Sequence, residues 1–204
     1  MAEGKRVAII ISHRINQETV AYHEVGHAIA AQYHEIRLAK MALTIVPGDD
    51  YSGRLQIVVR GCHWDVDTSD RARMKMERLA QAFLAGIAAQ RHHRPSSVRG
   101  YHASYDYREV NQFIRYFVKS QEEHDAYFKL LKIRTQDLFR RPDIWAKVQA
   151  LAAALLERKT LSANEIAEIN QATSARLLED HYKSKGWSLP SAQPTQDPRN
   201  NAKG

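Results

Sequence analysis

The sequence predicts a mainly α-helical domain with a small β-sheet or hairpin, an α+β fold. Apolar residues recur at helical spacing over most of the chain, and the β-rich runs are short. With 204 residues, 44% of them hydrophobic and 26% charged, the chain is long enough to bury a core. We expect one domain over residues 1–183 and a disordered tail over 184–204, where Pro and Asn accumulate.

The first elements are expected to be short strands and one helix. The apolar run at 7–11 is either a strand or a docking arm. A helix is expected from Ile15 to Glu35, because apolar residues fall on one side of it and two histidines on the other. That apolar stripe comprises Ala21, Tyr22, Val25, Ala28, Ile29 and Tyr33. The runs 43–46 and 55–59 favour two strands of a small sheet, because turn sequences rich in Pro, Gly and Asp separate them.

The rest of the chain is expected to be helical. Asp67-Thr68-Ser69-Asp70 offers an N-cap for a long helix, and Arg94-Pro95 stops it. The expected elements are a helix reaching about residue 92, a loop at 96–105, helical periodicity over 107–140, a restart after Pro142, and a last helix from 162 or 163 to about 182.

The first helix contains the motif His23-Glu24-Val25-Gly26-His27. Residues four apart stand one above the other on the same helix face, so both imidazoles can bind one metal ion. Glu24 lies on the flank, where it can handle a bound water. This H-E-x-x-H pattern is typical of zinc peptidases and predicts a helical, zincin-like peptidase domain.

A catalytic zinc site needs a third protein ligand. His34 shares the histidine face but lies about 16 Å from His23 along a straight helix, too far to join the ion. A metzincin would have Gly and His where this chain has Ala30 and Tyr33. The acidic candidates are Asp65, Asp67, Asp70, Glu77, Asp106 and Glu109. Asp70 and Asp106 both stand at the start of an expected helix, but a lone acidic residue at such a position is more often only a helix cap.

Several segments resemble the peptidase domain of the FtsH-type membrane AAA+ proteases. The run Val20-Ala21-Tyr22-His23-Glu24-Val25-Gly26-His27-Ala28 is similar to the V-A-Y-H-E-A-G-H-A run of that family. Two weaker similarities follow in the family's order, at 84–90 and at Ala103-Ser104-Tyr105-Asp106-Tyr107, and a specific one closes the series at 154–166. The resemblance covers about residues 17–172. It implies Zn²⁺ as the metal, His23, His27 and Asp106 as its ligands, and Glu24 as the catalytic base.

The chain departs from that family at named positions. Ile87 and Gln90 replace an Arg and a Glu, so a charge pair is absent, and Tyr105 and Tyr107 flank Asp106 where Asn and Leu are usual. No G-x-x-x-x-G-K-[ST] loop and no membrane anchor are expected in this chain. We therefore expect a zinc metalloendopeptidase that cleaves peptides or unfolded proteins without an ATPase of its own. A separate ATPase or adaptor and the ring-like homo-oligomer of the family stay open.

The two predicted strands could also bind the substrate. An extended substrate could pair with 43–46 or 55–59 by β-augmentation, as on an edge strand of the resembled family, or both runs could simply pack in the core. We give these interpretations equal weight. Tyr101, His102 and Tyr105 could help to stabilise an oxyanion, but loop aromatics more often only pack.

Charge and cysteine usage limit the other function classes. The net charge of +7 permits contact with nucleic acid or an anionic membrane, but such a surplus is most often only a solvated surface, and we expect no nucleic-acid partner. Such a binder would use the basic residues Arg71, Arg73, Lys75, Arg78, Arg91, His92, His93 and Arg94. A second alternative is a metal-binding interaction module without activity. The single cysteine, Cys62, and the lack of a signal sequence predict a cytoplasmic protein.

Overall fold

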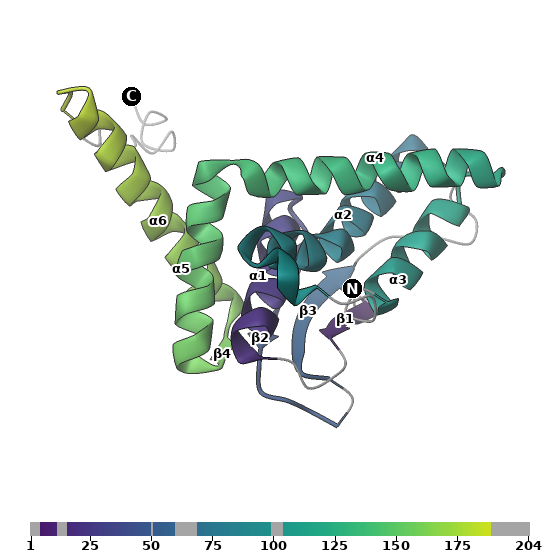
Figure 1. The fold of residues 1–204 in the computed structure, drawn as a ribbon, viewed down its shortest axis with the longest axis horizontal. Helices are drawn as coiled ribbons and strands as arrows, with labels where there is room; N and C mark the ends of the chain where they lie inside the picture. The colour runs from purple at the N-terminus through teal and green to yellow at the C-terminus, as the bar shows by residue number, and fades with distance from the viewer. Residues whose placement is uncertain (1–4, 12–15, 50, 60–68, 99–103, 189–204) are drawn as a thin grey trace, which may run out of the picture.

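The computed structural model describes residues 5–11, 16–49, 51–59, 69–98 and 104–188. Within them the chain is mainly helical with a small antiparallel sheet, so the predicted fold class is confirmed (Figure 1). The elements are β1 (Lys5–Ile11), α1 (Gln17–Tyr33), β2 (Arg37–Thr44), β3 (Gly53–Val59), α2 (Asp70–His93), the 3₁₀ turn η1 (Pro95–Ser97), α3 (Ser104–Arg115), α4 (Gln121–Arg140), α5 (Pro142–Arg158), β4 (Thr160–Leu161) and α6 (Ala163–Ser184). Cys62, Asp65, Asp67, Tyr101, His102 and most of the expected tail lie outside the described residues.

Helix α1 is the centre of the molecule and is buried on every side between residues 19 and 31, Tyr22 being partly exposed. The sequence predicted a one-sided apolar stripe, and this differs from the structure because α2 covers the histidine side as well. Tyr33, placed in that stripe, is 50% exposed at the helix end. The two helices approach closely at Gly26, where a Cβ would lie 2.5 Å from the Ala85 carbonyl oxygen and 2.6 Å from the Ala89 Cβ. Small residues on both helices therefore permit the crossing.

The sheet has the strand order β1-β3-β2-β4, and all its pairs are antiparallel. β1 pairs with β3 over its whole length, from Lys5 opposite Val59 to Ile11 opposite Gly53. The predicted strands lie in the β2–β3 hairpin, but β2 starts earlier and ends at Thr44, so that it includes only the first two residues of the run 43–46. β2 also carries an irregularity between Leu38 and Leu43.

The sheet corrects one expectation about these strands. β3 is paired on both sides, by β1 and β2, and the end of β2 is paired by β4 at Leu43 and Thr44. The predicted run 55–59 is thus an inner strand, and 43–46 is not a free edge at its paired residues. Leu43, Ile45, Leu55 and Ile57 are buried, which fits the core-packing interpretation.

The helical region after η1 is divided differently from the prediction. Periodicity predicted one stretch over 107–140, but α3 ends at Arg115 and α4 starts at Gln121. Ser120 caps the second helix by accepting a hydrogen bond from the Glu123 backbone N–H at 3.1 Å. Buried Val118 anchors the turn between them, so the apolar periodicity continues across a real break.

The last helices form an arm on one side of the molecule. α4 crosses the length of the molecule, α5 descends from its end after Pro142, and α6 projects away from the body (Figure 1). α6 begins with a capping box between Ser162 and Glu165, as its predicted start suggests. It buries only Ile166 and Thr173 fully. None of the described helices combines the length and the hydropathy needed to cross a membrane.

Candidate metal centre

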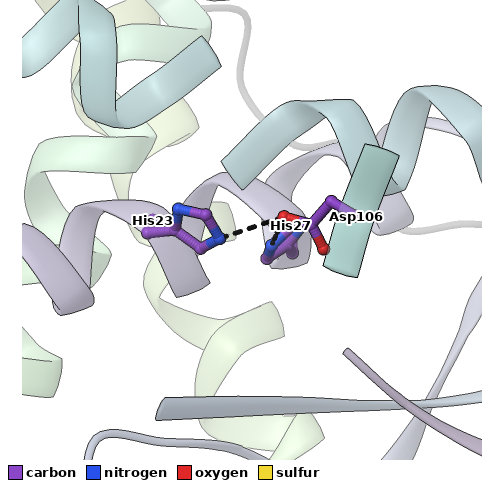
Figure 2. A group of neighbouring side chains, drawn as sticks. All are labelled: His23, His27 and Asp106. Atoms are coloured by element: carbon purple, nitrogen blue, oxygen red, sulfur yellow. Dashed lines mark ion pairs between the residues drawn. The ribbon is translucent and has the colours of Figure 1, made fainter. Parts of the chain in front are cut away.

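Two histidines of α1 and one aspartate of α3 converge in the interior (Figure 2). Oδ2 of Asp106 lies 3.3 Å from Nε2 of His23 and 3.6 Å from Nε2 of His27. The three side chains are at most 1% exposed, and their potential ligand atoms all lie within 4.8 Å of one another. The predicted ligand set is therefore brought together, and this group could bind a metal ion.

Nδ1 of each imidazole ring, the nitrogen that faces away from Asp106, contacts an oxygen atom of α2. His27 Nδ1 lies 2.7 Å from the Ala82 carbonyl oxygen, which can only accept, so His27 donates. His23 Nδ1 lies 3.0 Å from Gln90 Oε1, and the Gln90 amide nitrogen donates to the Ser97 carbonyl at 3.1 Å. Both rings therefore carry their proton on Nδ1 and present the Nε2 lone pair to Asp106, the arrangement of a metal-binding histidine.

Gly86 of α2 leaves space beside the same nitrogens. A Cβ at this position would overlap His27 Nε2 and stand 2.6 Å from His23 Nε2. Any larger residue would thus fill the region to which both lone pairs point. The roles of Gly86 and Gln90 were missed from the sequence, although both lie in the segment 84–90 that resembles the FtsH-type family. Gln90, noted there only as a departure, is a hydrogen-bond partner of His23.

The polar atoms of the group are poorly satisfied by protein alone. Nε2 of His23, Nε2 of His27 and both oxygens of Asp106 have no hydrogen-bond partner. Buried polar atoms without partners are costly, and a cation among these atoms would satisfy all of them. Burial lowers the pKa of His27 to about 4, against the opposing charge of Asp106. The imidazole is therefore neutral at pH 7, the form that binds a metal.

Glu24 lies beside the group, on the side of the sheet. It is fully buried, and burial, together with the charge of Asp106, raises its pKa well above the usual range, while the Leu55 backbone amide acts in the opposite direction. A Cβ at Gly53 of β3 would lie 2.7 Å from Glu24 Cγ and 3.0 Å from its Oε1. Glu24 thus sits between α1 and β3 and is not among the grouped ligand atoms. A carboxyl group with a raised pKa is suited to exchanging protons near neutral pH.

The other acidic candidates point elsewhere. Asp70 is exposed and pairs with Arg73 at 2.9 Å, directly after the actual N-cap Ser69. Glu77 accepts a hydrogen bond from Tyr127, and Glu109 lies 3.6 Å from Arg108. In the described part of the chain, the group of His23, His27 and Asp106 is the one set of three side chains with metal-ligand geometry.

The histidines of the basic candidates are engaged in packing. His93 stacks on Tyr22 with ring centroids 3.5 Å apart, and His92 packs edge-on against Trp145 at 4.3 Å. His34 ends α1 as its C-cap and does not join the metal group. Tyr105 lies near the ring of Phe83, at 6.4 Å between centroids, which fits the packing interpretation.

Comparison with known proteins adds no assignment. No family model matches the chain, and no curated protein matches it at a significant level.

Proposed function

We propose that this protein is a zinc-dependent metalloendopeptidase that hydrolyses peptide bonds of peptides or unfolded proteins. The observation that carries the proposal is the approach of Asp106 to the paired imidazoles of His23 and His27, with the buried carboxyl of Glu24 beside them. Two imidazoles and one carboxylate match the donor set of catalytic zinc sites, which keep one further position open.

His23, His27 and Asp106 would hold the ion, and Glu24 would act as the general base. Bound zinc supplies a Lewis acid that lowers the pKa of water and polarises a carbonyl group. Glu24 accepts a proton from the attacking water and returns it to the leaving amine. Gln90 and the Ala82 carbonyl keep the two rings in one tautomer and orientation, so that the donor atoms need no rearrangement.

The resemblance to the FtsH-type peptidase domain supports the same assignment, because its implied third ligand is the aspartate that lies next to the histidines. We extend the proposal to a cytoplasmic enzyme that acts on already unfolded chains, with a separate ATPase or adaptor and a homo-oligomer as further options. The principal alternative is a metal-binding interaction module without activity. It would use the same three ligands, and the presence of Glu24 favours the enzyme.

Three variants test the proposal. Purified protein supplied with zinc should bind one ion and cleave casein, an unfolded protein, without ATP. Glu24→Gln should keep the zinc and lose activity by about 10²–10⁴-fold, the contribution of a general base. Asp106→Ala should lose zinc and activity together. Glu179→Gln, which changes an exposed carboxylate of α6, is the matched control and should behave as wild type.

The possible outcomes separate the alternatives. Zinc binding without any cleavage would favour the inactive module, and failure of the protein to bind zinc would reject both. Full activity of Glu24→Gln would reject Glu24 as the base.

A further inference from the structure

Strand β3 passes directly beside Glu24, and β1 lies on its outer side. Gly53 contacts the Glu24 side chain, and the Leu55 backbone amide acts on its carboxyl group. In the β1–β3 register, Ile11 is opposite Gly53 and Ile9 is opposite Leu55. The backbone of residues 9–11 is therefore only one strand spacing, about 4.8 Å, from the part of β3 that contacts the proposed base.

β1 also borders the other side of the site. It lies between β3 and α3, the helix that carries Asp106, and contacts both (Figure 1). His23, Glu24 and His27 are 0% exposed in this arrangement, and Asp106 is 1% exposed. A peptide cannot reach these side chains while they are buried in this way, so a peptidase with this site needs part of its surroundings to move.

β1 is the element whose departure would create a suitable binding surface. The other side of β3 is already paired by β2, so β3 becomes an edge strand only without β1. Its unpaired backbone groups would then lie next to Glu24. An extended peptide could pair with them in the antiparallel direction, and main-chain hydrogen bonds would provide affinity with little dependence on sequence.

We propose that β1 is an internal competitor for peptide, because it occupies the outer edge of β3, the surface on which an extended peptide would otherwise pair beside Glu24. The proposal rests on the proposed peptidase function for its catalytic part, but the surface itself can be tested by binding alone. A substrate would replace one antiparallel ladder by another, so that β3 regains with the peptide the backbone hydrogen bonds that it loses with β1. The run Val7–Ile11, which is apolar and β-branched except at Ala8, suits such exchangeable pairing.

A reversible lock on β1 tests this inference in the full chain. Ala8→Cys with Gln56→Cys, in a Cys62→Ser background, places two thiols on directly opposed residues of β1 and β3. Opposed Cα atoms of an antiparallel pair are about 4.5–5.5 Å apart, within the range that a disulfide spans. Thr44→Cys with Thr160→Cys is the matched control, because it links β2 to β4 on the other side of the sheet.

Two measurements are made on the oxidised protein and after a non-thiol reductant. Binding of a fluorescent synthetic peptide with the sequence of residues 5–11 is followed by anisotropy in a Glu24→Gln background, which prevents cleavage. Casein cleavage is followed with Glu24 present. In the oxidised protein with the β1–β3 lock, we expect both peptide affinity and the rate of casein cleavage to be at least about tenfold lower than in the reduced protein. The reason is that the disulfide removes the state in which β1 has left β3. The control pair should show no such difference.

The outcomes distinguish this inference from the proposed function. Peptide binding that depends on the lock, without cleavage in either form, would support the surface and reject the peptidase. Cleavage that ignores the lock would overturn the surface and leave the peptidase intact. Peptide binding that is equal in both forms or absent from both would also overturn the surface. The inference would also be overturned if no disulfide formed in the Ala8–Gln56 pair and none formed in a second pair, Arg6→Cys with Val58→Cys.

Discussion

The α1–α2 crossing and the projecting helix α6 differ in what they bury. In the crossing, His23, Glu24 and His27 are fully enclosed, and several of their polar atoms lack protein partners. In α6 most polar residues are exposed, and the helix is stabilised by an N-terminal capping box and surface ion pairs. Among the described residues, buried polar atoms without a partner are therefore concentrated at the crossing, whereas α6 has one such atom, Oδ1 of Asn170.

The largest effect on the metal centre is expected from filling the space beside the imidazoles. Gly86→Ala places a methyl group against Nε2 of both histidines, so we expect zinc affinity to fall by about 100-fold or more. Chelator competition measures the affinity, and thermal melting without zinc measures any loss of fold. Ala175→Ser adds one atom to an exposed position of α6 and should change neither quantity. Wild-type affinity in Gly86→Ala would show that the ion binds elsewhere.

A smaller effect is expected from the residue that orients His23. Gln90→Ala removes the acceptor for Nδ1, and losses of this kind typically lower metal affinity by about 10–100-fold. Gln90→Glu keeps an acceptor oxygen and should recover most of the loss, which a purely packing role would not explain. Gln149→Ala on the exposed side of α5 is the control. Equal affinities of wild type and Gln90→Ala would contradict the orienting role.

The end of α1 offers a pH-dependent comparison with its centre. Burial, with Arg78 nearby, lowers the pKa of His34 to about 4 from an ordinary value near 6.5. The unfolded chain therefore binds a proton first, and stability that is complete above pH 6.5 is lost as the pH falls toward 4. Because the ring is partly exposed, we expect a loss of only about 1 kcal/mol between pH 7 and pH 5. Urea unfolding of wild type and His34→Gln measures it, and parallel pH profiles would contradict the prediction.

The smallest effect should come from α6 and should leave the metal centre untouched. Ser162→Ala removes the capping oxygen that accepts the Glu165 N–H, at a cost of about 1 kcal/mol or less at this partly exposed site. Thermal unfolding should report this loss, while zinc affinity stays as in wild type. A fall in zinc affinity would show that α6 and the crossing are coupled.

Local signals predicted most helices of this fold. The N-cap Ser69, the stop at Arg94-Pro95 and the start at Ser162 all act over a few residues, and each is seen in the structure. The break at 116–120 was missed because buried Ile114 and Val118 continue the apolar periodicity across it. The sheet was predicted only as a hairpin or two strands, with 7–11 as either a strand or a docking arm, because strand order depends on pairing between distant segments.

The sequence by itself determined that two imidazoles share one helix face with a carboxyl beside them, because a spacing of four residues dictates this on any α-helix. Only the tertiary structure decided that Asp106 completes the group, that Gln90 and Gly86 of α2 shape it, and that β1 lies along β3 next to Glu24. These contacts join segments far apart in the chain, and they depend on helix packing and strand register, which no local pattern encodes.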